Sequence, residues 1–183
     1  MGEKVLTVHG RGEHGHVVAC AALGRGWMVR WTDGIDRTAP DPNAPFIIGI
    51  GHNAVRKQFD APGMTKVVHS AACVDPSAVI APGTFVGPMA VVHVGARVGR
   101  GCIINTGAIV EHNCVVNSWA HISPGAVLCG NVEIGEGAWI GANAVVKQGL
   151  TIAPWVTVGC GAVVVKDITE PGTYIGVPVH KMN

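Results

Sequence analysis

A histidine between a carboxylate and an amide, Glu111-His112-Asn113, is the feature of this sequence best suited to chemistry. Gly130 follows His112 by 18 residues, which is one full coil of the repeat described below. We therefore expect the imidazole to lie one strand spacing, about 4.8 Å, from the backbone of a residue without a side chain. The imidazole would accept a proton and the Gly130 N–H would polarise an acyl carbonyl, an arrangement suited to acyl transfer.

Two more polar residues, Asn105 and His121, fall in the same stretch of the chain. His121 lies half a coil from His112, so the period of the repeat places the two histidines on different edges. They could meet only across a subunit interface. His93 precedes Glu111 by one coil and is interpreted as a corner or interface residue, whereas His112 is interpreted as catalytic and His121 as a site residue.

The element that must position these residues is a repeat of six. From Val74 to Val164 an aliphatic residue returns at every sixth position, sixteen times without a miss. The residue four places later is usually Ala or Cys, and Gly often follows the aliphatic residue directly. This pattern predicts a parallel β-helix with aliphatic residues inside and small residues at the turns. We expect left-handed backbone angles at corner glycines and at four asparagines: Asn105, Asn117, Asn131 and Asn143.

Residues 1–68 follow a different pattern and are predicted to form a small Rossmann-like α/β domain, with the solenoid and a C-terminal tail over residues 69–183. The expected order is strand, helix, strand, Pro-rich loop, strand, helix and a last short strand before the solenoid. The expected segments are Lys4–His9, Val17–Leu23, Trp27–Trp31, the loop Pro40–Pro45, Phe46–Gly51, Asn53–Phe59 and Val67–Val68.

A glycine turn, Gly10-x-Gly12-x-x-Gly15, follows the first predicted strand. It matches a dinucleotide fingerprint formally, but the predicted sheet is too small for a full dinucleotide fold. The favoured interpretation is a turn and helix N-terminus that hold the phosphates of a nucleotide-linked substrate, with a purely structural turn as the alternative. Asp33 and Asp36 follow the second strand and could contact a ribose or base, or could simply be loop residues.

Composition limits the function classes. The formal charge is +1, which argues against nucleic acid as the main partner because phosphate binding needs a clustered positive field. Charged residues make up 14% and hydrophobic residues 48% of the chain, which excludes disorder. There is no apolar run long enough for a membrane span or a signal peptide, so we expect a cytoplasmic protein. The six cysteines contain no C-x-x-C pair and are expected to be small buried residues.

Four segments together resemble a known family. They are the glycine turn with His14, IINTGAIVEHNCVV at Ile103–Val116, HISPGAVLCG at His121–Gly130, and the ending Gly176-Val177-Pro178. They are similar to hexapeptide-repeat sugar acyltransferases of the sialic acid O-acetyltransferase and bacillosamine-pathway nucleotide-sugar N-acetyltransferase type. The resemblance implies a left-handed β-helix, a homotrimer, acetyl-CoA in a groove between neighbouring solenoids, a nucleotide sugar on the N-terminal domain, and no metal.

The resemblance also implies roles for individual residues. His112 matches the general base, and Gly130 matches the position whose N–H meets the thioester carbonyl. The other implied roles are acceptor binding by Asn105 and His121, sugar-nucleotide contact by His14, pantetheine contact by Ala142 and Cys160, and adenine contact by the tail Gly176–Lys181. This sequence departs from the family at Glu13, at Asn113, where members often carry an acid, and at Val179-His180-Lys181.

We therefore expect an acetyl-CoA-dependent N-acetyltransferase that acts on the amine of a nucleotide-linked amino sugar. The alternative is O-acetylation of a sugar hydroxyl. A hydroxyl needs a stronger base than an amine does, and an asparagine at position 113 supports the His112 base less than an acid would. Attack is expected to be direct, because no Cys or Ser lies in a recognisable nucleophile setting. More distant alternatives are a zinc-dependent hydratase of the carbonic-anhydrase-like kind, with His93, His112 and His121 as ligands, and a non-catalytic scaffold.

Overall fold

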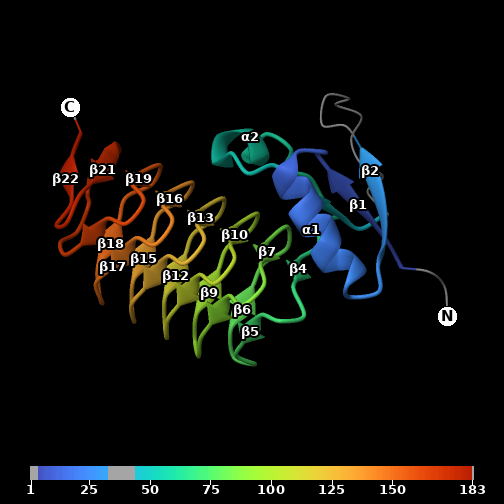
Figure 1. Ribbon diagram of the computed structural model, residues 1–183, viewed down its shortest axis with the longest axis horizontal. Helices are drawn as coiled ribbons and strands as arrows, with labels where there is room; N and C mark the ends of the chain where they lie inside the picture. The colour runs from blue at the N-terminus through green and yellow to red at the C-terminus, as the bar shows by residue number, and fades with distance from the viewer. Residues whose placement is uncertain (1–3, 33–43, 183) are drawn as a thin grey trace.

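The computed structural model describes residues 4–32 and 44–182. A small parallel sheet with two helices occupies the N-terminal part, and a parallel β-solenoid follows it (Figure 1). Asp33, Asp36 and most of the predicted Pro-rich loop lie outside the described residues.

The N-terminal sheet has three parallel strands in the order β2-β1-β3. Its elements are β1 Val5–His9, α1 Glu13–Leu23, β2 Met28–Thr32, β3 Phe46–Ile48 and α2 Asn53–Lys57. The first helix begins at Glu13, four residues before the predicted start, because Gly12 is already the extended N-cap residue. Gly15 therefore lies inside the helix, where a Cβ atom would overlap the carbonyl oxygen of Gly10. The third glycine of the turn is needed for this close approach of helix and turn.

Two-residue strands from β4 to β20 form the three faces of the solenoid, and each of them pairs with the strand 18 residues away in the same sheet. Sheet I contains β4 Val67–Val68, β7 Phe85–Val86, β10 Ile103–Ile104, β13 His121–Ile122, β16 Trp139–Ile140, β19 Thr157–Val158, β21 Thr173–Ile175 and the antiparallel β22 His180–Lys181. Sheet II contains β5 Cys73–Val74, β8 Val91–Val92, β11 Ile109–Val110, β14 Val127–Leu128, β17 Val145–Val146 and β20 Val163–Val164. Sheet III contains β6 Val79–Ile80, β9 Arg97–Val98, β12 Val115–Val116, β15 Glu133–Ile134 and β18 Thr151–Ile152. The result is a solenoid of about six turns.

The predicted six-residue register is confirmed by the interior of the solenoid. All of the repeating aliphatic residues are buried except Val74, which is half-buried at the first coil. Val67–Val68 pairs with β7, so it is the first strand of sheet I rather than a strand before the solenoid. The prediction of buried cysteines holds for Cys102 and Cys114 only, because Cys20, Cys73 and Cys160 are exposed and Cys129 is half-buried.

The corners use the left-handed region at a fixed place. Every sixth residue from Gly83 to Gly161 has a positive φ, three positions after the aliphatic residue. Asn131 and Asn143 occupy such positions as predicted, but Asn105 and Asn117 do not. The glycines that directly follow aliphatic residues have another purpose, since a Cβ at Gly99 would lie 2.6 Å from the Ser118 nitrogen of the next coil.

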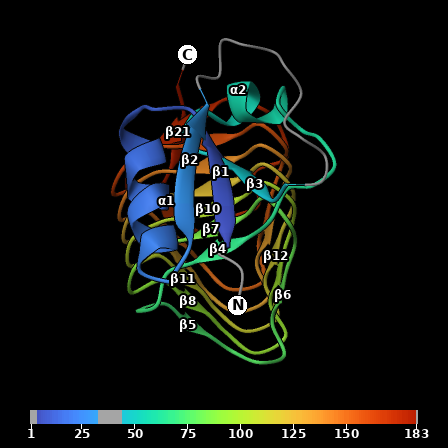
Figure 2. The ribbon, with the colours of Figure 1, turned by 90° about the vertical axis from the view of Figure 1, so that its right-hand side faces the viewer.

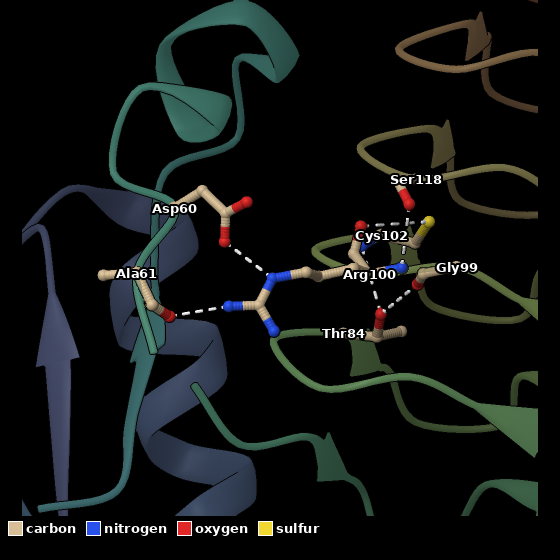
Figure 3. A network of polar contacts seen from close by, with 7 residues as sticks. All are labelled: Asp60, Ala61, Thr84, Gly99, Arg100, Cys102 and Ser118. Carbon is tan, nitrogen blue, oxygen red and sulfur yellow. Dashed lines mark hydrogen bonds and ion pairs between the residues drawn. The ribbon is translucent and has the colours of Figure 1, made fainter. Parts of the chain in front are cut away.

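The N-terminal part covers one end of sheet I (Figure 2). Val67, Phe85 and Ile103 point out of sheet I and join the hydrophobic cluster formed by β1, β3 and α1. Arg100 adds a polar connection, donating from Nε to Asp60 Oδ1 at 2.6 Å and from a terminal nitrogen to the Ala61 carbonyl at 2.6 Å (Figure 3). These contacts hold the N-terminal part against β4, β7 and β10 of sheet I, while Asn53 of α2 reaches further along the solenoid and donates to the carbonyls of Gly137 and Ala138.

Candidate active site

His112 lies at the corner between sheets II and III, in the turn that follows β11. Its ring lies against Gly130 one coil further on, where any Cβ atom would overlap Cε1 and Nε2 of the imidazole. The contact predicted from the eighteen-residue period is therefore present, and it explains why position 130 is glycine. No acceptor in the described part of the chain takes the Gly130 N–H.

Asn113 and Glu111 contact His112 in different ways. An amide atom of Asn113, assigned as Nδ2, lies 3.3 Å from His112 Nδ1, whereas Glu111 Oε2 accepts from the His112 backbone N–H at 3.2 Å. Asn113 therefore contacts the ring and Glu111 holds the backbone. Asn113 has φ 57° and belongs to the series of left-handed corners, a conformation that asparagine tolerates better than most residues. The backbone thus gives a local reason for asparagine at this position.

A second polar cluster lies on the outer face of sheet I. His121 Nε2 is 3.1 Å from Asn105 Nδ2, and its ring stacks on Trp139 with centroids 5.7 Å apart and planes inclined by 3°. Burial, with smaller contributions from the charges of Arg56 and His14, lowers the pKa of His121 to about 3. His121 is therefore neutral at physiological pH.

His14, on the first turn of α1, faces the same cluster. Its ring meets Phe85 edge to face at 5.5 Å, and its Nε2 is enclosed without a hydrogen-bond partner in the described chain. Burial first, and then the charge of Arg56, lowers the pKa of His14 to about 4. Gly12 caps the helix without a side-chain hydrogen bond, so no N-cap side chain closes the helix N-terminus beside His14.

Arg56 is a buried cation that sequence reasoning missed. It donates to the carbonyls of Gly101 at 2.7 Å and Trp119 at 2.9 Å in the solenoid, and to Asn53 Oδ1 at 2.9 Å in α2. Gly101 and Trp119 are successive members of one corner column, so Arg56 joins α2 to two coils at once. The sequence of α2 does not predict this role for Arg56, because the Gly101 and Trp119 carbonyls that accept from it lie far along the chain.

A shallow pocket of about 110 Å³ lies beside Trp139 and was also not predicted. Its walls are His52, Asn53 and Ala54 from the start of α2 and Gly137, Trp139, Trp155 and Thr157 from the solenoid. Lys57 Nζ lies 5.4 Å from the Trp155 ring centroid and is paired with Glu136.

A single chain does not bring all of the predicted site residues together. Asn105, Ala142 and Cys160 lie at the corner between sheets I and II, whereas His112 and Gly130 lie at the corner between sheets II and III. Lys181 is on β22, where its Nζ is 2.9 Å from Glu170 Oε2. His93 is exposed one coil before Glu111.

Residues 4–32 and 44–182 contain no group of three or more His, Cys, Asp or Glu side chains that could hold a metal ion. Over the same ranges, neither helix is long and apolar enough to cross a membrane.

Comparisons with known proteins agree with the fold. Residues 131–166 match the family model for the bacterial transferase hexapeptide with six repeats. A comparison with curated proteins gives no match. Among solved structures, the acetyltransferase domain of PglB from Neisseria gonorrhoeae is 34% identical with a TM-score of 0.92, over 98% of this chain and 100% of that chain. The same domain has been solved in complex with acetyl coenzyme A.

Two further structures are similar. PerB from Caulobacter crescentus, in complex with CoA and GDP-perosamine, is 27% identical with a TM-score of 0.90, over 100% of this chain and 98% of that chain. WeeI from Acinetobacter baumannii is 22% identical with a TM-score of 0.84, over 97% and 99% of the two chains, and shows the fold alone. The solenoid and these matches define an acyltransferase with hexapeptide repeats. The chain belongs to the hexapeptide-repeat sugar acyltransferase family.

Proposed function

We propose that this enzyme transfers the acetyl group of acetyl-CoA to the amine of a nucleotide-linked amino sugar, with His112 as the general base. The observation that carries the proposal is the His112 ring lying against Gly130, whose N–H has no acceptor in the described chain. The relatives support the substrate classes, since one was solved with acetyl coenzyme A and another with CoA and GDP-perosamine.

The proposed chemistry is direct attack. The amine nitrogen adds to the thioester carbonyl, and the Gly130 N–H donates to the oxygen as it becomes negative. His112 accepts the proton that the nitrogen loses. When the carbon–sulfur bond breaks, the imidazolium returns that proton to the departing thiolate, so the histidine is restored. The amide of Asn113 orients the ring, and the pantetheine arm would lie along Ala142 and Cys160.

The N-terminus of α1 and the glycine turn suit the phosphates of the acceptor. Gly10 has φ 100°, which glycine adopts readily, and Gly12 leaves the first helical N–H groups without a side-chain cap. Glu13 is exposed at this end of the helix, so its carboxylate can point into solvent away from a bound phosphate. His14 would then contact the sugar end of the nucleotide.

A homotrimer is proposed because the outer face of sheet II is apolar along its whole length. Its outward residues are Cys73, Val91, Ile109, Val127, Val145 and Val163. Sheet III carries Arg97 and Glu133 on its outer face, and sheet I is partly covered by the N-terminal part. Sheet II lies between the two corners that carry the separated site residues. Contacts between sheet II faces around a threefold axis would bring His112 of one subunit toward Asn105 of the next.

Replacing Val127 with Glu should dissociate the trimer, because the carboxylate would be buried in an apolar interface without a partner. Val115→Glu is the matched control, since Val115 has the same outward position on sheet III. We expect size-exclusion chromatography with light scattering to give a monomer without transferase activity for Val127→Glu and a wild-type trimer for Val115→Glu. A Val127→Glu protein that stayed trimeric and active would place the interface elsewhere.

Gly130→Ala should reduce turnover by about 10–10²-fold, because the new methyl group displaces the His112 ring from its position. The affinity for the sugar nucleotide should be unchanged, since Gly130 is remote from the glycine turn. Gly107→Ala provides a control at a corner where a Cβ meets nothing within 4 Å, although its positive φ adds strain. Equal turnover in Gly130→Ala and wild type would remove the contact from the mechanism.

The test of the proposed function is to mix acetyl-CoA with UDP-, GDP-, dTDP- and CMP-linked amino sugars and to follow thiol release. Release with a 4-amino sugar nucleotide, and an N-acetyl product by mass spectrometry, is the expected result. No release with any amine, together with acetylation of a free sialic acid, would establish O-acetylation instead.

A further inference from the structure

The amide of Asn105 has a defined orientation. Its Oδ1 accepts the backbone N–H of Thr106 at 2.8 Å, and the Thr106 hydroxyl lies 3.5 Å from the same oxygen. A flipped amide would place two donors face to face at Thr106. The atom that faces His121 Nε2 at 3.1 Å is therefore Nδ2, which can only donate.

Because Asn105 donates, His121 Nε2 must accept. A neutral imidazole carries one N–H, so the proton of His121 is on Nδ1. A charged His121 ring would place a second donor opposite Asn105. It would also be repelled by Arg56 on α2 and by His14 on α1, which both lower its pKa. These contacts favour the neutral ring, and burial acts in the same direction.

The ring is also held in position. Trp139 stacks on it from the next coil, and the Trp139 indole N–H donates to Ser123 Oγ at 2.7 Å, which fixes the plane of the stack. No residue in the described chain accepts a hydrogen bond from His121 Nδ1. This atom is not fully enclosed, because the enclosed side-chain atoms without a partner in the described chain are His9 Nε2 and His14 Nε2. The structure thus presents one oriented N–H group to a ligand.

We propose that Asn105 is a positioning residue that fixes His121 as the Nδ1–H tautomer, so that the Nδ1–H group donates to a hydroxyl oxygen of the acceptor sugar beside the reacting amine. The sugar partner rests on the proposed function, whereas the tautomer does not. The partner is an oxygen because an ammonium group offers no lone pair. A neutral amine that gave its lone pair to His121 could not attack the thioester.

The tautomer is tested by ¹⁵N-detected correlation spectra of the imidazole in the whole protein, assigned by comparison with His121→Asn. We expect a protonated Nδ1 and an unprotonated Nε2 across pH 5–9 in the wild type. Asn105→Asp is the matched variant, because a carboxylate of the same size accepts from Nε2–H and reverses the two signals. A wild-type ring protonated on Nε2 would overturn the proposal, whether or not the enzyme transfers acetyl groups.

The hydrogen bond to the sugar is tested by kinetics. Asparagine at position 121 keeps a donor near the place of Nδ1, whereas glutamine moves the donor toward the place of Nε2. We expect the KM for the sugar nucleotide to rise about tenfold in His121→Gln and Asn105→Asp and to stay within about threefold in His121→Asn, with the KM for acetyl-CoA unchanged. The wild-type sugar KM should not follow a titration of His121 between pH 5 and 9. The assignment to a sugar oxygen would be overturned if the KM for the sugar nucleotide rose as much in His121→Asn as in His121→Gln, or if the variants changed kcat alone.

Discussion

Replacing His112 with alanine should lower kcat by about 10²–10⁴-fold, the usual contribution of a general base. The loss is expected because the amine must shed a proton as it adds to the thioester, and the basic ring that lies against Gly130 is that of His112. The KM for acetyl-CoA should change little, because the base does not hold the pantetheine arm. Steady-state kinetics with saturating sugar nucleotide measure both constants.

Two variants make this result specific. His112→Asn keeps a polar side chain without the base, so it should bind both substrates and allow a ternary complex to be trapped. His93→Ala, which removes an exposed imidazole one coil earlier on the neighbouring column, should leave turnover within a few-fold of wild type. If His112→Ala kept full turnover at neutral pH, the amine would need no base and His112 would only position it.

The solenoid could be predicted because a parallel coil repeats one environment many times. Each aliphatic residue packs in the same interior, and a shift of the six-residue register would expose every later aliphatic side chain. The period is therefore visible in the sequence without any tertiary information. The contact between His112 and Gly130 was predictable for the same reason, since one coil fixes which residues lie against each other. The corner conformations were predicted less well, because asparagine also occurs at positions such as Asn105 where its side chain makes hydrogen bonds.

The N-terminal part was predicted as elements but not as packing. The helix start at Glu13 depends on the extended Gly12 and on the contact between Gly15 and Gly10, which no periodicity reveals. Likewise Asn105 and His121 could be singled out as polar residues, but the tautomer follows only from the Thr106 N–H that orients the amide. These features depend on particular backbone groups, and residue types do not specify them.

Arg56→Gln should be the most destabilising single change at the junction between α2 and the solenoid. Arg56 is 1% exposed, and its side chain donates to five backbone carbonyls, those of Ile50, Gly51, Gly101, Trp119 and, at 3.5 Å, Ala120. Glutamine is too short to reach them all, and each buried carbonyl left without a donor costs about 1–3 kcal/mol. We expect a loss of about 3–5 kcal/mol, comparable to breaking a buried charged network.

Lys57→Met is the matched control, since Lys57 is the next residue of α2 but is exposed and paired with Glu136 at the surface, where such pairs contribute about 0–1 kcal/mol. Urea unfolding followed by tryptophan fluorescence should separate the two variants. Where Arg56→Gln remains folded, the pKa values of His14 and His121 should rise, because the positive charge that lowers both is gone while their burial is kept. Equal unfolding free energies for the two variants, with both histidine pKa values unchanged, would mean that Arg56 neither joins the two parts nor tunes the site.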